Sequence, residues 1–221
     1  MELVLDTADV EAIRDLSTSC KVAGVTTNPK IIVASGKQPM DAVRDVIACL
    51  DDDQKFFMQV VATDFEGMME DARLISGLRP KNAIVKIPVT KVGLQAIKAC
   101  TEEGIRTLGT VVYTAEQGML AAVNGAEYLA PYVNRISMYG DGTETAARLA
   151  AMLDVQGMDT KVMGASFHNV GQVRDLIEAG CKAVTLPPNI LSTIIDNPTV
   201  TDVVDDFSAV WHEAYGTDSI A

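Results

Sequence analysis

Short runs of aliphatic residues alternate with longer amphipathic segments along almost the whole chain. Eight of these runs, rich in Val, Ile and Leu, have the length of a buried strand. They cover residues 3–7, 22–29, 56–63, 83–90, 106–114, 127–136, 161–168 and 183–188. Between the runs apolar residues recur at helical spacing, as they do at Val10, Ile13 and Leu16. The pattern predicts eight β-strands, each followed by a helix.

A strand–helix alternation of this kind favours a parallel sheet covered by helices. Eight such units in 221 residues fit the α/β class and a (β/α)8 TIM barrel at the small end of its size range. A doubly wound open sheet is the alternative. That fold favours a glycine-rich turn after the first strand, and the sequence "LDTADVE" has no glycine there. Because no linker or shift in composition interrupts the chain, we expect one barrel domain over residues 1–221.

Residues 197–221 follow the last strand–helix unit and form a C-terminal extension. Their apolar side chains recur at helical spacing, at Val203, Val204, Phe207, Val210, Trp211 and Tyr215. The sequence therefore predicts an additional C-terminal helix with an apolar stripe. This stripe either closes the bottom or side of the barrel or docks on a neighbouring subunit.

The charge balance limits the classes of partner. The chain has 18 Lys and Arg against 30 Asp and Glu, which gives a net charge of −12. Such a surface repels nucleic acid and anionic lipid, so neither is an expected partner. No apolar run reaches the ~18 residues of a membrane span, and the N-terminus lacks the basic start of a signal peptide. We expect a cytoplasmic protein.

The residues that usually bind metals are few and scattered. The four cysteines do not form a CxxC pair, and the chain has only two histidines. These are Cys20, Cys49, Cys100, Cys181, His168 and His212. The sequence predicts no metal site, no catalytic cysteine and no Ser-His-Asp triad.

Polar residues lie late in several of the apolar runs. In a TIM barrel the functional groups gather where the strands end, so side chains from different strands converge on one mouth. The candidates at these strand ends are Asp6, Thr26, Asn28, Gln59, Lys86, Thr110, Tyr132, Asn134, Arg135 and Ser166. Each one singly is also typical of a turn or cap residue, so the prediction depends on their convergence.

Lys86 is the most informative of these residues, because it lies within "AIVKIPVT", residues 83–90. Strand alternation places Lys86 on the face of Ile84 and Pro88. A closed barrel has no edge strand, so the lysine is expected inside the barrel or at its mouth. Burial lowers the pKa of an ammonium, and a neutral amine condenses with carbonyls to a Schiff base. A structural ion pair with Asp6 remains the alternative.

Longer motifs resemble the class I aldolases of the transaldolase-like group, closest to the fructose-6-phosphate aldolases. The matching stretches include "LDTADV", "AGVTTNPKII", "IVKIPVTKVGLQAIK", "GAEYLAPYVNRI" and "AGCKAVTLP", in the order of that family and over nearly the whole chain. The resemblance implies a (β/α)8 fold whose Schiff-base lysine, on the fourth strand, corresponds to Lys86.

The resemblance also implies roles for other residues. Asp6 corresponds to a carboxylate that assists proton movement during C–C cleavage. Gln59 and Thr110 correspond to the pair that positions a catalytic water, and Tyr132 to a phenol that transfers protons with that water. Thr26 and Asn28 match residues that bind the hydroxyl groups of the donor, and Asn134 is also expected to bind substrate.

Two positions distinguish the branches of this family. Transaldolases of this size carry Glu and Phe where this chain has Gln59 and Tyr132. A carboxylate and a phenol differ in pKa by ~6 units, so the proton path differs between the branches. The residues of this chain favour aldol cleavage over obligate transfer of a dihydroxyacetone unit.

The phosphate site of the family corresponds to Arg135, Ser166 and a second cation just after the serine. Here "SFHN" places His168 where lysine or arginine is expected. A histidine with the ordinary pKa of ~6.5 is mostly neutral at pH 7, so the site loses one full charge. The acceptor is therefore a phosphorylated, unphosphorylated or otherwise anionic aldehyde such as a sulfonate.

Taken with the resemblance, the sequence predicts a Schiff-base aldolase that cleaves a ketose or ketose phosphate, such as fructose 6-phosphate, to dihydroxyacetone and an aldehyde. A transaldolase is the first alternative, and a non-catalytic sugar-phosphate-binding barrel is the second. No cofactor is expected, because the protonated imine supplies the polarisation that a metal otherwise provides. The expected partners are a sugar or sugar phosphate and further copies of the chain, in a homo-oligomer of five or ten subunits as the resemblance implies.

Overall fold

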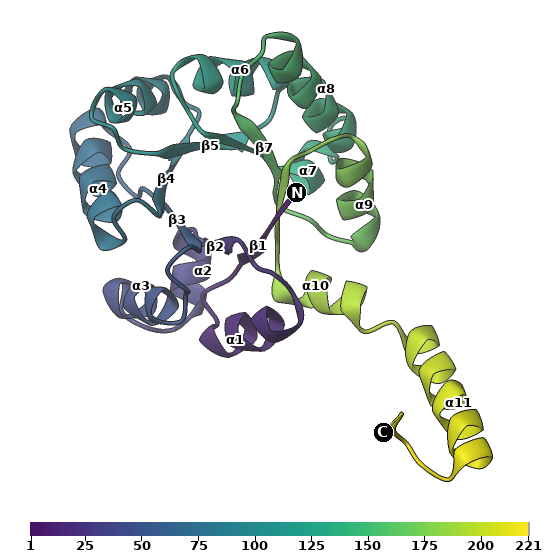
Figure 1. Cartoon of the computed structure of the whole chain (residues 1–221). Helices are drawn as coiled ribbons and strands as arrows, with labels where there is room; N and C mark the ends of the chain where they lie inside the picture. The colour runs from purple at the N-terminus through teal and green to yellow at the C-terminus, as the bar shows by residue number, and fades with distance from the viewer. Residues whose placement is uncertain (221) are drawn as a thin grey trace.

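The computed structural model describes residues 1–220 and shows a closed ring of eight parallel strands surrounded by helices (Figure 1). Each strand pairs with the next along the chain, and β1 pairs with β8. The strands are β1 Glu2–Asp6, β2 Gly24–Thr26, β3 Lys55–Gln59, β4 Ala83–Pro88, β5 Thr107–Val112, β6 Tyr128–Pro131, β7 Lys161–Gly164 and β8 Ala183–Leu186. The predicted (β/α)8 barrel is confirmed, and the open-sheet alternative is wrong.

The helices follow the strands in the predicted order. Their bounds are α1 Val10–Ser19, α2 Pro29–Ala34, α3 Pro39–Ala48, α4 Phe65–Leu78, α5 Lys91–Glu102, α6 Ala115–Val123, α7 Val133–Ile136, α8 Gly142–Val155, α9 Val170–Glu178, α10 Pro188–Ile195 and α11 Pro198–Tyr215. Side-chain caps fix several of their starts: the Asp9 carboxylate accepts from two backbone N–H groups of α1, and Thr114 and Gln117 form a capping box on α6.

Seven of the eight strands are shorter than the apolar runs that indicated them, and two of these show why. In the run 22–29 the strand ends at Thr26, because Asn28 caps α2 and Pro29 begins that helix. In the run 127–136 the strand ends at Pro131, and the last four residues form α7. The backbone N–H of Ile136 donates to the carbonyl of Tyr132 at 2.9 Å, so this segment satisfies its backbone locally beyond the end of its strand.

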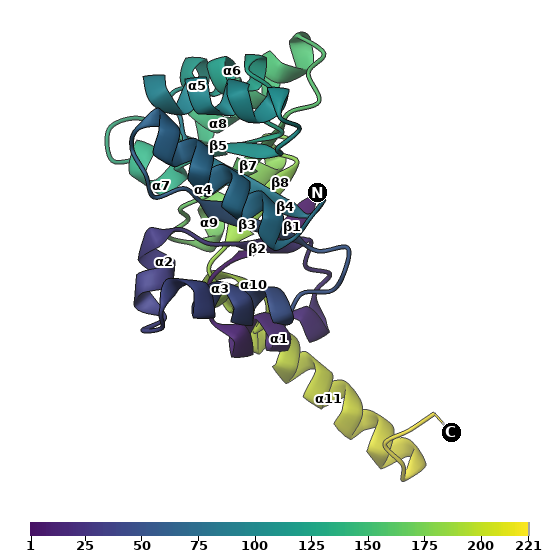
Figure 2. The ribbon, with the colours of Figure 1, turned by 90° about the vertical axis from the view of Figure 1, so that its left-hand side faces the viewer.

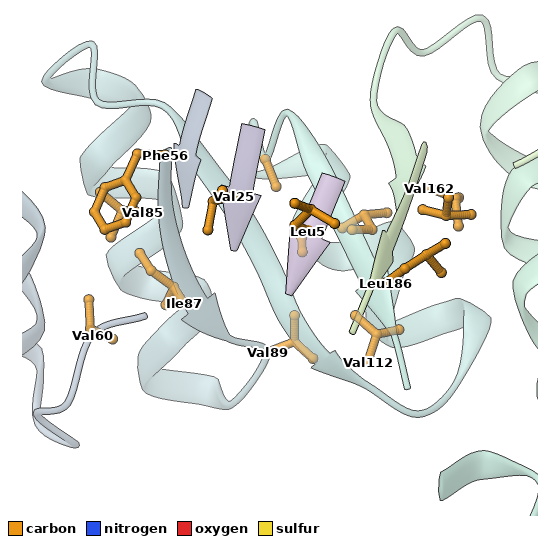
Figure 3. Close-up of a cluster of buried hydrophobic side chains, with 14 of the residues drawn as sticks. Leu5, Val25, Phe56, Val60, Val85, Ile87, Val89, Val112, Val162 and Leu186 are labelled. Carbon is orange, nitrogen blue, oxygen red and sulfur yellow. The ribbon is translucent and has the colours of Figure 1, made fainter. Parts of the chain in front are cut away.

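The main hydrophobic core lies between the strands and the helices (Figure 3). Strand residues that face outward, such as Leu5, Val25, Val85 and Ile87, are fully buried there. The residues between them face the barrel axis, where Val4, Phe57 and other side chains fill the lower interior. This alternation places Lys86 on the axial side of β4, the same side as Ile84, which lies two residues earlier.

A cluster of charges closes the N-terminal end of the barrel. The Glu2 carboxylate accepts hydrogen bonds from Lys161 at 2.6 Å, Lys55 at 3.0 Å and the Tyr128 hydroxyl at 2.8 Å. Burial alone would raise the pKa of Glu2, but these donors lower it from 4.5 to about 2. At this end of the barrel, called the barrel floor below, the ionised carboxylate of Glu2 therefore joins β1 to β3, β6 and β7.

The additional C-terminal helix is present as α11, which projects away from the barrel (Figure 2). None of its residues is buried, so its apolar stripe does not close the bottom or side of its own barrel. Phe207 is 68% exposed and Trp211 38%. The predicted extension, 197–221, includes Ala221, which lies outside the described residues. Within residues 1–220, no helix combines the length and hydropathy that a membrane span requires.

Candidate active site

A cavity of about 560 Å³ opens at the end of the barrel where the strands finish. Figure 2 shows α2 and α7 projecting from this end, opposite the end that carries the N-terminus. Most of the residues predicted from strand ends line the cavity together. They are Asp6, Thr26, Asn28, Gln59, Lys86, Tyr132, Arg135 and Ser166. The convergence expected from the barrel geometry is therefore observed.

Three predicted residues do not line this cavity. Thr110 is fully buried behind it and donates a hydrogen bond to the Tyr132 hydroxyl at 3.3 Å. The Asn134 side chain accepts a hydrogen bond from Gln172 at 3.2 Å. His168 is exposed, and its backbone N–H bonds the same Gln172 side chain at 2.7 Å. The imidazole of His168 is thus outside the cavity altogether.

Lys86 lies in the wall of the cavity and is 5% exposed. Its Nζ donates to the backbone carbonyl of Thr27 at 2.9 Å. Burial lowers the pKa of Lys86 below its ordinary value, and the negative charge of Asp6 partly opposes this change. A buried amine that is readily neutral and faces an open cavity has the properties of a Schiff-base nucleophile.

The alternative role for Lys86 was an ion pair with Asp6. Among residues 1–220 no carboxylate forms an ion pair with Lys86. Asp6 is instead held by Thr26, whose hydroxyl lies 2.6 Å from Asp6 Oδ1. The two charges influence each other through the cavity without direct contact.

A residue not identified from the sequence continues the Asp6 contact. The hydroxyl of Thr185, on β8, lies 2.6 Å from the hydroxyl of Thr26. Both threonines are buried, and Thr185 also lines the cavity. A single threonine within an apolar strand does not by itself predict a functional residue. The contact between Thr185 and Thr26 becomes visible only because the barrel closes and places β8, β1 and β2 side by side.

Gln59 lies beside Lys86, since the two residues pair in register between β3 and β4. Residues in register on parallel strands direct their side chains to the same face of the sheet. The Gln59 side chain makes no hydrogen bond to another residue within the described part of the chain, 1–220. Its amide is therefore available to a water or a substrate in the cavity.

Tyr132 follows β6 and faces the same cavity. Burial raises the pKa of its phenol, although the hydrogen bond from Thr110 opposes that change. The phenol is consequently protonated at neutral pH. Because Thr110 donates to it, the Tyr132 hydroxyl keeps its own proton free for another acceptor.

The backbone at one side of the mouth is strained. Among residues 1–220, three non-glycine residues have positive φ, and two of these, Val111 at 60° and Ser166 at 61°, line the cavity. A β-branched residue rarely adopts this conformation, and such outliers cluster at functional sites. Val111 lies where the pairing of β5 with β6 shifts register, so a bulge produces its conformation. Neither outlier was predicted from the sequence.

Ser166 and Arg135 are brought together by backbone pairing. The N–H groups of Val133 and Asn134 donate to the carbonyls of Ala165 and Ser166 at 3.0 and 3.1 Å. Helix α7 is thus attached to the segment after β7. The Arg135 guanidinium lies 5.5 Å from the Tyr132 ring, and no carboxylate pairs with it among residues 1–220.

Lys30 is a second cation at the mouth that the sequence pattern did not reveal. It lies in the first turn of α2, lines the cavity and has no carboxylate partner within the described chain. Apart from the amine of Lys86, whose pKa is lowered, the cavity therefore has two cationic side chains, Lys30 and Arg135, against one carboxylate, Asp6. In a protein of net charge −12, this local excess of positive charge favours an anionic ligand.

The described residues contain no group of three or more His, Cys, Asp or Glu side chains placed to hold a metal ion. The buried thiols are also poor nucleophiles. Burial, together with the nearby charge of Glu103, raises the pKa of Cys100 to about 11, and burial raises that of Cys181 to about 11. Both therefore remain thiols at neutral pH.

Two solved structures share the barrel. An arginine-to-lysine mutant of flavocytochrome b2 matches 85% of this chain and 56% of its own, with a TM-score of 0.61 and 12% identity. A leucine-to-alanine mutant of flavocytochrome b2 with benzoylformate matches 83% of this chain and 53% of its own, with a TM-score of 0.57 and 13% identity. This chain spans about half the length of those structures, and the likeness concerns the fold alone.

The family match is of a different kind, because it covers the sequence itself. The family described as Transaldolase/Fructose-6-phosphate aldolase matches residues 3–218. That range includes every strand of the barrel from Leu3 onward and every residue that lines the cavity. It confirms the resemblance seen in the sequence motifs. The chain belongs to the transaldolase/fructose-6-phosphate aldolase family.

Proposed function

We propose that the chain is a Schiff-base aldolase that reversibly cleaves a ketose or ketose phosphate to dihydroxyacetone and an aldehyde. Its family is enzymatic and supports a class I aldolase type of function. The observation that carries the proposal is the state of Lys86. Its amine is buried, its pKa is lowered, it has no ion pair among residues 1–220, and it borders the cavity.

In this proposal the neutral Lys86 amine adds to the C2 carbonyl of the ketose, and loss of water gives an iminium. The C3–C4 bond then breaks, and its electron pair moves into the iminium to form an enamine. The C4 hydroxyl loses its proton as the aldehyde forms, and Asp6 is the carboxylate in the cavity that can receive it.

The enamine must next be protonated at C3, and Tyr132 is suited to that step. Its phenol is protonated at neutral pH and keeps its own proton available. Gln59 and Thr110 are proposed to hold the water that works with this phenol. Protonation regenerates the iminium, and water releases dihydroxyacetone and restores the Lys86 amine.

A transaldolase is the second candidate, because the enamine on Lys86 is common to both reactions. In that reaction the enamine attacks an acceptor aldehyde instead of taking a proton. The phenol of Tyr132 and the neutral amide of Gln59 favour protonation, since transaldolases of this size have a phenylalanine and a glutamate at these places. We therefore propose the aldolase as the principal activity.

We further propose that the substrate carries an anionic group at the end away from the reacting carbonyl. Arg135 and Ser166 lie together at the mouth, and Lys30 supplies a further cation in the same cavity. His168 does not contribute its imidazole, because that side chain lies outside the cavity. A phosphate or sulfonate fits this chemistry. Thr26 and Asn28 are proposed to bind the donor hydroxyl groups. Asn134 is proposed to bind substrate at the mouth, where its side chain accepts a hydrogen bond from Gln172.

We also propose that the protein is a homo-oligomer. The stripe of α11 includes Val204, Phe207 and Val210, all more than half exposed. A helix with an exposed apolar face and no buried residue gains stability by packing on another molecule. A further copy of this chain is the proposed partner.

The test of the proposed activity is borohydride reduction in the presence of dihydroxyacetone, followed by peptide mass spectrometry. We expect a covalent adduct at Lys86 and none in Lys86→Met. If the wild-type protein forms no adduct, the aldolase and transaldolase proposals both fail, and the hypothesis of a non-catalytic sugar-phosphate-binding barrel is left. If the adduct forms, aldehyde release from the ketose without an added acceptor identifies an aldolase, and release that requires an acceptor identifies a transaldolase.

A further inference from the structure

A short chain of buried hydroxyl groups ends on the carboxylate of Asp6. Thr185 Oγ1 lies 2.6 Å from Thr26 Oγ1, which in turn lies 2.6 Å from Asp6 Oδ1. The three residues come from β8, β2 and β1, which are neighbours in the barrel. Thr26 is 0% exposed and Thr185 2% exposed, so no bulk water competes for these bonds.

The direction of the hydrogen bonds in this chain follows from the protons available. Each threonine hydroxyl has one proton to donate, and an ionised carboxylate only accepts. When Asp6 is ionised, Thr26 must donate to it, and Thr185 must donate to Thr26. Thr185 makes no other side-chain hydrogen bond within residues 1–220, so its proton is free for this use.

We propose that Thr185 is a positioning residue that keeps the Asp6 carboxylate oriented by acting through Thr26. Donation from Thr185 polarises the Thr26 hydroxyl and makes it a stronger donor to Asp6. The chain holds Oδ1 against the barrel wall, and Asp6 Oδ2 has no partner among the described residues. Oδ2 is the oxygen left to meet the substrate.

This role rests on the proposed aldolase activity. As C3–C4 breaks, the C4 hydroxyl proton passes to Oδ2 of Asp6, and both threonine hydroxyls keep their own protons. The hydrogen bonds from the threonines hold Oδ1 in place during this step, so Oδ2 keeps its direction towards the C4 hydroxyl.

Other charged groups also lie near Asp6. On the side of the barrel axis these are Lys86 and Tyr132, with Lys30 and Arg135 in the same cavity. On the side of α1 and α2, Asp6 borders a second cavity whose charged residues are Asp9, Glu11, Arg14 and Lys37. A single uncharged substitution at Thr185 leaves all of them in place, which isolates the contribution of the hydroxyl chain.

The test compares Thr185→Val, which keeps the shape of the side chain but removes the hydroxyl, with Thr185→Ser, which keeps the hydroxyl. The matched control is Thr107→Val, because the Thr107 hydroxyl is buried with no hydrogen-bond partner among residues 1–220 and does not line the cavity. Two rates are measured for each protein at one pH: trapping of dihydroxyacetone on Lys86 by borohydride, and kcat for cleavage of the ketose, together with its KM.

For Thr185→Val we expect kcat to fall about three- to tenfold with KM little changed, which is the size of one hydrogen bond. The rate of trapping should not change, because adduct formation depends on Lys86 and not on the orientation of Asp6 Oδ2. Thr185→Ser should restore the wild-type kcat, and Thr107→Val should match wild type.

The proposal is overturned if Thr185→Val keeps the wild-type kcat, if it loses trapping and kcat equally, or if Thr185→Ser fails to restore kcat. Should Thr185→Val not fold, Thr185→Cys supplies a weak donor of similar size, and an intermediate loss of kcat is expected. An unchanged kcat in that variant also overturns the role. If wild type forms no Lys86 adduct, the aldolase proposal fails first and this role fails with it. A normal adduct with an unchanged kcat in Thr185→Val rejects the role of Thr185 alone.

Discussion

Lys86 Nζ donates a 2.9 Å hydrogen bond to the backbone carbonyl of Thr27, and no carboxylate of the described chain is within ion-pair distance. A carbonyl accepts from an amine as well as from an ammonium, so this contact holds Lys86 in place without fixing its charge. The lysine is therefore oriented at the cavity wall while burial favours its neutral form.

The first prediction concerns the pH dependence of adduct formation at Lys86. Because burial lowers the pKa of this lysine, the rate of trapping with dihydroxyacetone and borohydride should reach half of its maximum well below pH 10.5, the ordinary lysine value. Asp6 opposes the lowering, so Asp6→Asn should move the midpoint to still lower pH. A midpoint that stays in place or rises in Asp6→Asn would contradict the electrostatic coupling.

The second prediction separates Tyr132 from Schiff-base formation. Tyr132→Phe should lower the rate of ketose cleavage by about 100-fold, the lower end of general acid–base effects, while the Lys86 adduct still forms. Transfer of the enamine to an added aldehyde should persist. Tyr113→Phe is the control, since its ring lies 6.4 Å from that of Tyr132 and does not line the cavity. Equal losses of cleavage and adduct in Tyr132→Phe would exclude the proposed proton transfer.

The third prediction assigns the second cation of the mouth to Lys30. Lys30→Gln should raise KM for a phosphorylated aldehyde about two- to fivefold, as expected for an exposed charge, and leave the unphosphorylated aldehyde unaffected. Arg135→Gln should raise it further. His168→Gln should have no effect, because the imidazole lies outside the cavity. Lys21→Gln, which removes an exposed lysine just before β2, controls for net charge. The assignment fails if His168→Gln weakens phosphate preference and Lys30→Gln does not.

The fourth prediction concerns acid stability at the barrel floor. The pKa of Glu2 is lowered to about 2, below its ordinary value of 4.5, so its stabilising effect is complete above pH 4.5 and disappears as pH falls towards 2. Glu2→Gln should reduce the free energy of unfolding by about 1–2 kcal/mol at pH 7, allowing for partial solvent screening. The difference from wild type should shrink between pH 4.5 and 2.

Urea unfolding of both proteins at several pH values measures this difference. Glu102→Gln provides the control, because Glu102 forms only an exposed 3.8 Å ion pair with Lys98 and should change stability little at any pH. A wild-type advantage over Glu2→Gln that is unchanged from pH 5 to pH 2.5 would show that the Glu2 charge is not its source.

The fifth prediction tests the role of α11. Replacing Phe207 with Asp places a charge on the apolar stripe, and we expect a smaller particle in solution at the same protein concentration. Val123→Asp, at an equally exposed valine on the C-terminal end of α6, should keep the wild-type mass. Light scattering coupled to size exclusion measures both. An unchanged mass for Phe207→Asp would remove α11 from the subunit interface.

The sequence by itself determined the barrel and the place of its lysine. Eight aliphatic runs separated by amphipathic segments allowed few folds, because a strand buried on both sides and a helix with one apolar face each require a particular spacing of side chains. Period-2 alternation placed Lys86 on the axial face of β4, where the structure has it. The order of the motifs was sufficient to indicate the family that residues 3–218 match.

Only the tertiary structure decided which polar residues meet. Thr185 and Thr26 are 159 positions apart in sequence, yet closure of the barrel brings their hydroxyls to 2.6 Å. Lys30 lines the cavity, where α2 begins at Pro29, whereas His168, two residues after the positive φ of Ser166, does not. Local patterns report which face of a strand or helix a residue occupies. Contacts between side chains also depend on strand register, strand ends and backbone turns, which the whole packed barrel sets together.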